Sequence, residues 1–145
     1  MSDDLNLDDF MCFALYTANH AMNRVYKPML DALDLTYPQY LVMVTLWKED
    51  RQTVGGIGEK LHLESSTLTP LLKRMEATGY IKRQRGKEDE RVVIIGLTEE
   101  GRELRKRAAS IPACILDASG REFAELKRLA ADVITLRDTL SRYET

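Results

Sequence analysis

The chain has 145 residues, a formal net charge of −2, and a composition that is 44% hydrophobic and 30% charged. This length suits one domain with a hydrophobic core and is too short for two independent ones. No apolar run approaches the roughly 18 residues of a membrane-spanning helix, so we expect no membrane contact. The two cysteines and two histidines are too scattered for a metal site or a disulfide framework, and we expect no metal and no cofactor.

Charge is distributed unevenly along the chain. The segment 73–91 holds seven basic and four acidic residues, a net charge of +3, which leaves −5 for the remainder. A basic strip on an acidic body is typical of a protein that contacts phosphate with one edge, although solvated charged loops have the same pattern. Met1–Asp9 carries four Asp and no Lys or Arg, the reverse of a targeting segment, so we expect a cytoplasmic protein.

The first third of the chain predicts two helices. The segment Asp8–Leu33 has apolar residues at helical spacing, and its start is apolar nearly all round, which indicates burial between elements or between subunits. We expect Pro28 to kink or divide this helix, because proline has no N–H and its ring crowds the preceding turn. A second helix is expected to begin near Thr36, with Pro38 in its first turn.

The next segment predicts a helix-turn-helix. A glycine-rich helix over 55–61 and a turn over 62–64 precede a second helix, for which Ser65 or Ser66 is the expected N-cap and Gly79 the expected end. The second helix of such a motif lies in the major groove of DNA. The candidate DNA-binding residues on this helix are Ser65, Ser66, Thr67, Thr69, Pro70, Lys73 and Arg74.

Two strand-like runs follow, Tyr80–Gln84 and Arg91–Leu97, joined by the charged stretch Arg85–Glu90. A helix-turn-helix followed by a basic hairpin is typical of a winged helix, whose wing tip suits phosphate or the minor groove, and Lys87 is a candidate contact there. The other interpretation is a structural cover over a helical core. We therefore predict a mainly α fold with a small β-wing, in which 53–97 forms the helix-turn-helix and the wing.

The C-terminal part predicts more helix. Thr98 is expected to cap a helix that continues to about Ile111 before Pro112 interrupts it. From Leu126 to Tyr143, apolar residues alternate three and four apart, a heptad seam that suits either a helix packing on a partner subunit or an ordinary core helix. We expect a single domain over residues 1–145, with dimerisation helices in 1–33 and 112–145.

In this order, the predicted elements resemble the MarR family of bacterial repressors over the whole chain. Asp89-Glu90-Arg91 matches the Asp-x-Arg signature of the family's wing. The resemblance implies that Arg91 enters the minor groove and that Asp89 positions it. It also implies a homodimer built from the first and last helices, which binds a double-stranded, pseudo-palindromic operator as a repressor and is not an enzyme.

Within that family, the chain is similar to the organic hydroperoxide resistance regulators. The match is carried by Cys12 within Phe-Met-Cys-Phe-Ala-Leu-Tyr, by Tyr26, by Tyr37 within Tyr-Pro-Gln-Tyr, and by Cys114 beyond the wing. The resemblance implies that Cys12 is the thiol oxidised by organic hydroperoxides, and that Tyr26 and Tyr37 are its hydrogen-bond partners from the same and the neighbouring subunit. It further implies that Cys114 is the resolving cysteine of a two-cysteine subtype and that oxidation releases the operator.

The chemistry of such a sensor fits these residue types. A thiol reacts with peroxide as the thiolate, to which tyrosine hydroxyls donate hydrogen bonds, and apolar neighbours favour an alkyl or lipid tail. The product is a sulfenic acid, which condenses with a second thiol or is oxidised further. Two alternatives stay open: a repressor released by a reversibly bound aromatic ligand, and a thiol peroxidase, for which no thioredoxin-like strand–helix–strand pattern is present.

Overall fold

The structure, a computed structural model, describes residues 5–143, which form two compact units divided between Ala109 and Ser110. Residues 1–4 and 144–145, the outermost parts of the two expected dimerisation segments, lie outside the described residues. The first unit contains η1 (Leu7–Asp9), α1 (Met11–Asp31), α2 (Tyr37–Lys48), β1 (Gln52–Thr53), α3 (Val54–Leu61), α4 (Ser65–Thr78), β2 (Ile81–Arg85), β3 (Val93–Leu97) and α5 (Glu99–Ala108). The second unit contains α6 (Ile111–Ser119) and α7 (Phe123–Ser141).

The two N-terminal helices follow from local sequence signals. α2 begins with a reciprocal capping box, in which the Thr36 hydroxyl accepts from the Gln39 N–H and the Gln39 side chain accepts from the Thr36 N–H. α1 begins at Met11, after a single 3-10 turn. The expectation that Pro28 could divide α1 is wrong, because the helix continues to Asp31 with the proline one turn from its end, where only one intrahelical hydrogen bond is lost.

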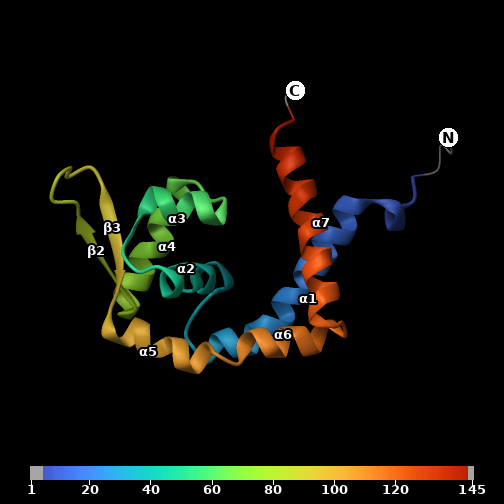
Figure 1. Ribbon diagram of the computed structural model, residues 1–145, viewed down its shortest axis with the longest axis horizontal. Coiled ribbons are helices and arrows are strands. Elements are labelled where there is room, and N and C mark those ends of the chain that lie inside the picture. The colour runs from blue at the N-terminus through green and yellow to red at the C-terminus, as the bar shows by residue number, and fades with distance from the viewer. Residues whose placement is uncertain (1–4, 144–145) are drawn as a thin grey trace. The chain divides into compact units, whose positions relative to one another are not determined.

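A three-stranded antiparallel sheet completes the winged helix, in the order β1-β3-β2. The long hairpin pairs Ile81 with Leu97 and Arg85 with Val93, and its strands lie close to the two strand-like runs that the sequence predicts. Its tip projects away from the helices of this unit (Figure 1). β1 has only two residues, of which Gln52 pairs with Ile95, and so short a strand leaves no alternating pattern in the sequence. The mainly α fold with a small β-wing is confirmed.

The helix-turn-helix is fixed by a core and by one close backbone approach. A Cβ on Gly58 of α3 would lie 2.7 Å from the Leu63 carbonyl oxygen, so only glycine lets the turn pass this close to the helix. Because α4 packs through its buried residues on α2, α3 and β2, its outer face has a fixed direction. The fully buried side chains of this core are Val42, Met43, Leu46, Ile57, Leu68, Leu72, Met75, Ile81 and Ile95.

The ends of the later helices correct two expectations. The N-cap of α4 is Glu64, with no side-chain hydrogen bond, so neither serine caps the helix, whereas Gly79 ends it with φ 98° as expected. Thr98 caps α5, its hydroxyl accepting from the Gly101 N–H. Pro112 does not interrupt α5, which has already ended at Ala108; it is the second residue of α6, where a missing N–H costs least.

Long-range hydrogen bonds join the turn between α1 and α2 to the end of α4 and to α5. The Tyr80 hydroxyl, just after α4, donates to the Leu33 carbonyl at 2.7 Å. The Arg107 guanidinium of α5 donates to the Ala32 carbonyl at 2.7 Å. The turn before α2 is therefore tied to the residue after α4 by the Tyr80 hydrogen bond and to α5 by the Arg107 hydrogen bond.

Much apolar surface on α1 and α7 is not buried within the chain. α7 has no buried residue, and α1 buries only Leu30. Large exposed apolar residues on α1 include Phe10 at its N-cap, Met11, Met22 and Val25; those on α7 include Phe123, Leu129, Val133, Ile134 and Leu140. Within residues 5–143, no helix is both long enough and apolar enough to cross a membrane.

Candidate functional site

The outward face of α4 is polar and accessible, as a helix that enters a DNA groove requires. Leu68, Leu72 and Met75 are buried beneath it. Pro70 lies inside the helix, so the carbonyl one turn earlier has no intrahelical donor and is free for another partner. Of the candidate DNA-binding residues, Thr69 is half-buried, and Ser65, Ser66, Thr67, Pro70, Lys73 and Arg74 are exposed.

At the wing tip, Asp89 holds Arg91 in a defined orientation. One carboxylate oxygen accepts from Arg91 Nε at 3.1 Å and from its backbone N–H at 3.0 Å, and the other accepts from Nη2 at 3.2 Å. These hydrogen bonds hold the pKa of Asp89 below its usual value. Because the Arg91 side chain is 91% exposed, this pair orients the guanidinium and adds little stability. Lys87 is exposed in the same loop.

Cys12 is exposed and lies in the first turn of α1. The N–H groups of a first helical turn have no intrahelical acceptors and form the positive end of the helix dipole, which favours an anion such as a thiolate. Phe10, Met11 and Phe13 surround it in sequence, and Met11 is 63% exposed. The apolar run that the sequence predicts to be buried is thus largely uncovered within one chain.

Three tyrosines form a cluster where α1 meets α2. The ring of Tyr26 lies 5.0 Å from that of Tyr37 and 5.8 Å from that of Tyr40, between centroids. Burial and the two neighbouring hydroxyls raise the pKa of Tyr26 to about 12, and burial also raises the pKa of Tyr37 and of Tyr40. All three hydroxyls therefore stay protonated at neutral pH and are available as hydrogen-bond donors.

The tyrosine cluster is far from Cys12 of the same chain. Cys12 and Tyr26 both lie on α1, fourteen residues apart, which corresponds to about 21 Å along a helix. Tyr37 lies beside Tyr26 and is equally remote. A hydrogen bond needs about 3 Å, so the expectation that one of these tyrosines serves Cys12 from the same subunit is wrong. A contact of Tyr26 or Tyr37 with Cys12 therefore requires a second chain.

Cys114 lies inside α6 and is exposed. The sequence places it at a helix break after Pro112, but the backbone there is regular helix. Both cysteines are therefore accessible thiols on helices of different units.

Sequence reasoning missed two further tyrosines, one in the tyrosine cluster and one close to Cys12 on α1. Tyr40 is buried against Tyr26, a contact that the Tyr-Pro-Gln-Tyr spacing could have indicated, because residues three apart share a helix face. Tyr16 is four residues from Cys12 on α1 and therefore on the same face. It stacks on His20, with ring centroids 4.3 Å apart, and is the tyrosine of the same chain closest to Cys12 in sequence.

Comparisons with known proteins define the class. Residues 24–107 match the family described as Transcriptional regulator SarA/Rot. The organic hydroperoxide resistance transcriptional regulator of Bacillus subtilis is 47% identical over 138 residues, covering 95% of this chain and 94% of the relative. With its winged-helix fold, the chain is thus a transcriptional regulator and not an enzyme.

Solved structures agree with this assignment. Reduced AbfR bound to DNA has a TM-score of 0.80 at 37% identity, covering 90% of each chain; AbfR is a protein of Staphylococcus epidermidis. A disulfide-formed AbfR structure has a TM-score of 0.64 at 36% identity, covering 90% of this chain and 87% of that one. The chain belongs to the MarR family, in the branch of the organic hydroperoxide resistance regulators.

Proposed function

We propose that this protein is a cytoplasmic, homodimeric repressor that binds a pseudo-palindromic operator when reduced and releases it when organic hydroperoxide oxidises Cys12. Two observations carry the proposal. Cys12 is an exposed thiol, and the protonated, clustered Tyr26 and Tyr37 are too far from it to contact it within one chain. The similarity to the Bacillus subtilis regulator supports the class of inducer. Residues 1–145 act as one functional domain.

The reading surface consists of α4 and the wing. α4 presents Lys73 and Arg74 with the small polar residues before them to the major groove, and Arg91, held by Asp89, enters the minor groove. A similar chain, AbfR, has been solved bound to DNA, which supports this assignment. Each subunit contacts one half-site, so the operator mirrors the two-fold symmetry of the dimer.

The exposed apolar residues of α1 and α7 support the dimer. A folded chain rarely leaves so many large apolar side chains uncovered, and α7, which contacts α6, has no fully buried residue. The heptad positions Leu129, Val133 and Leu140 are all exposed on α7 and give a continuous stripe for a second copy. Tyr143 of the predicted seam lies beyond the end of the helix at Ser141.

The dimer also completes the sensor. Tyr26 and Tyr37 of the partner subunit donate hydrogen bonds to the Cys12 thiolate, which lies in the first turn of α1. The thiolate attacks the terminal oxygen of the hydroperoxide, so a sulfur–oxygen bond forms and the oxygen–oxygen bond breaks. The alkoxide leaves with a proton as the alcohol, and Cys12 becomes a sulfenic acid.

Cys114 supplies the second step. Its sulfur attacks the sulfenic sulfur of Cys12 in the partner subunit, a disulfide forms, and the hydroxyl leaves as water. A disulfide requires Cα atoms within about 7 Å, so its formation moves α1 or α6 and changes the spacing of the two recognition helices. A disulfide form is also known for the similar AbfR chain.

The pocket beside the tyrosines has a volume of about 180 Å³ and is lined by Asn23, Tyr26, Leu30 and Tyr37, among others. A cavity of about 150 Å³ already holds a benzene ring, so this volume suits a small aromatic inducer and the tail of a hydroperoxide equally. The Cys12→Ser variant separates the two functions, because release by a bound inducer needs no thiol.

DNA binding by the reduced protein and by Cys12→Ser, with and without cumene hydroperoxide, tests this function. Both proteins should bind the promoter region of the regulator's own gene, and only the wild type should release it, because a serine hydroxyl is a poor nucleophile at neutral pH. Non-reducing gels of the treated wild type should show a covalent dimer, absent from Cys114→Ser. Release by Cys12→Ser would exclude the thiol, and a treated wild type that stays monomeric on the gel would remove Cys114 from the mechanism.

A further inference from the structure

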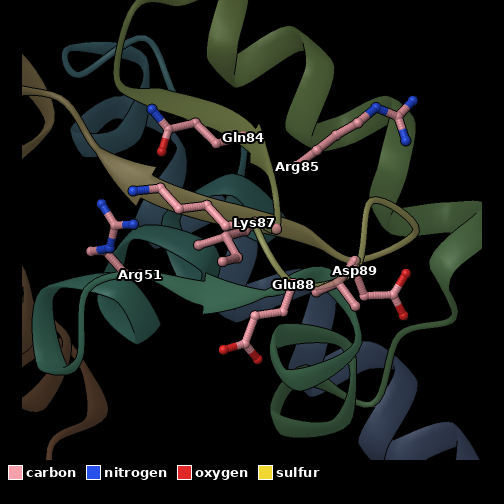
Figure 2. A pocket seen from close by; sticks show the side chains of 9 residues that line it. Arg51, Gln84, Arg85, Lys87, Glu88 and Asp89 are labelled. Carbon is pink, nitrogen blue, oxygen red and sulfur yellow. The ribbon is translucent and has the colours of Figure 1, made fainter.

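The outer face of the wing sheet carries a pocket of about 460 Å³, which includes Lys87 and Asp89 of the wing tip but also Arg51, a residue that the proposed DNA interface does not use. We call it the outer wing pocket; Arg51, Gln84, Lys87 and Ile94 line it, with the backbone of the wing loop. Arg51 precedes β1 and Lys87 lies in the wing loop, so residues far apart in sequence meet on one surface. Figure 2 shows the side chains of Arg51 and Lys87 extending to the same side of the sheet.

The charge of this pocket is not neutralised by its own acidic residues. Arg51 and Lys87 form no ion pair with any residue between 5 and 143. The carboxylates of Glu88 and Asp89 point away from the two cations (Figure 2), and Asp89 is occupied by Arg91. The pocket therefore presents the unpaired cations of Arg51 and Lys87 and the Gln84 amide to solvent, a donor set that suits an anion. A third lining cation, Arg85, donates instead to the Glu90 carbonyl.

Arg51 is held in place at a conformational cost. Its φ is +60°, in the left-handed region that favours glycine and asparagine. The Asp50 carboxylate maintains this turn by accepting from the Arg51 N–H and from the Leu97 N–H of β3, both at 2.8 Å. A Cβ on Gly96 would lie 3.8 Å from Arg51 Cγ, so the arginine stem crosses the sheet over this glycine. A long cationic side chain at a glycine-favouring turn indicates a role for the side chain itself.

We propose that the outer wing pocket binds a backbone phosphate of the same duplex that the wing tip contacts. The proposal rests on the proposed function, because it extends that DNA interface from Arg91 and Asp89 to Arg51. Two observations favour DNA as the occupant: the pocket shares Asp89 with the wing-tip ion pair, and its free charge is positive. A guanidinium beside an ammonium and an amide binds a phosphate through its oxygens and reads no base.

The experiment measures binding of the reduced wild type, Arg51→Gln and Arg51→Gly to the promoter fragment and to a random duplex of about three helical turns. Each lost phosphate contact should lower the slope of log affinity against log salt by about 0.9, or about 1.8 for a dimer. Affinity should fall about sixtyfold at about 0.1 M salt for a dimer that loses two contacts, equally on both duplexes, since phosphates carry no sequence information. Arg51→Gly should melt no lower than the wild type, because glycine suits the left-handed turn.

Lys106→Gln is the matched control. It removes the same charge from α5, at the end of the sheet opposite the wing tip (Figure 1), where Lys106 pairs with Glu103. It should bind both duplexes with wild-type affinity and salt slope. The inference is overturned if the Arg51 variants bind both duplexes with the wild-type slope, or if they weaken only the promoter fragment. Absence of any promoter preference in the wild type would instead remove the proposed function.

Discussion

The winged-helix region from α2 to α5 and the two long helices α1 and α7 differ in how they use their apolar residues. The winged-helix region buries Met43, Leu46, Leu68 and Leu72 completely within one chain. On α7, by contrast, Leu140 is 63% exposed and no residue is buried. The first region is therefore stable by its own packing, whereas the second keeps its apolar surface for assembly.

This difference corresponds to two proposed roles: the winged-helix region binds DNA, and α1 with the tyrosine cluster senses the peroxide. DNA-reading residues lie on a rigid scaffold, as precise contacts to a duplex require. In the proposed dimer, Cys12, its first helical turn and the tyrosine cluster lie where a second chain completes both packing and chemistry. Oxidation can then change the assembly without unfolding the region that reads DNA.

The largest effect is expected in the core of the winged-helix region. Leu72→Ala removes a fully buried side chain from α4 and should lower the free energy of unfolding by about 2–5 kcal/mol. Urea unfolding at several protein concentrations measures this loss, which should not depend on concentration. A loss below about 1 kcal/mol would show that the core tolerates the cavity and is not closed within the chain.

Assembly should instead respond to the exposed stripe of α7. Val133→Asp places a charge in the proposed interface and should weaken dimerisation by about a hundredfold or more, since an unpaired buried charge costs about 3–5 kcal/mol. Sedimentation equilibrium gives the dissociation constant. Thr135→Asp, on the opposite face of the same helix, is the control and should dimerise normally. Equal behaviour of the two variants would place the interface elsewhere.

The connection between the two regions is expected to have an intermediate effect. Tyr80→Phe removes the hydrogen bond from the end of α4 to the Leu33 carbonyl and should cost about 1 kcal/mol of stability. Cys12 should be oxidised at the wild-type rate, but DNA release should require more peroxide, because α4 is no longer tied to the turn before α2. Mass spectrometry measures the oxidation of Cys12, and DNA binding by the same samples measures release. Unchanged release would show that the Tyr80 hydrogen bond does not couple oxidation to the movement of α4.

The smallest effect concerns alkaline pH. Tyr26 has a folded-state pKa of about 12, above the ordinary value of 10.0. Between these values the unfolded chain loses the proton that the folded chain retains, so stability should fall as pH rises from about 10 to about 12. Tyr26→Phe should make that fall shallower in thermal unfolding. An identical pH dependence in the variant would exclude the tyrosine cluster as its source.

Much of the reading region could be predicted from the sequence because its signals are local. The Thr36 cap, the glycine that ends α4 and the β-branched run of β3 each specify structure within a few residues. The expected cap at Ser65 or Ser66 was wrong because the helix begins one residue earlier than expected, so that Glu64 is the N-cap and both serines lie inside the helix. β1 was missed because two residues show no period.

The sequence proposes the residues of a sensor but not their geometry. Cys12, Tyr26 and Tyr37 are singled out by their spacing and by the resemblance to peroxide-sensing regulators. Spacing does not show whether the tyrosines contact Cys12 of the same chain or of a second chain. The continuous helix from Met11 to Asp31 decides this, because it separates the thiol from the tyrosines. The outer wing pocket was equally hidden, since Arg51 reaches it only through a left-handed turn.

The central claim, that the sensor is completed across the dimer, is tested most directly by mixed dimers. One subunit carries Cys12→Ser with both tyrosines intact; the other keeps Cys12 and carries Tyr26→Phe and Tyr37→Phe. In the mixed dimer one Cys12 faces two intact tyrosines of the partner subunit, so half of the sites should react with organic hydroperoxide at the wild-type rate, although neither parent homodimer does. If the mixed dimer reacts as slowly as the tyrosine-substituted parent, the tyrosines do not act across the interface and the account is contradicted.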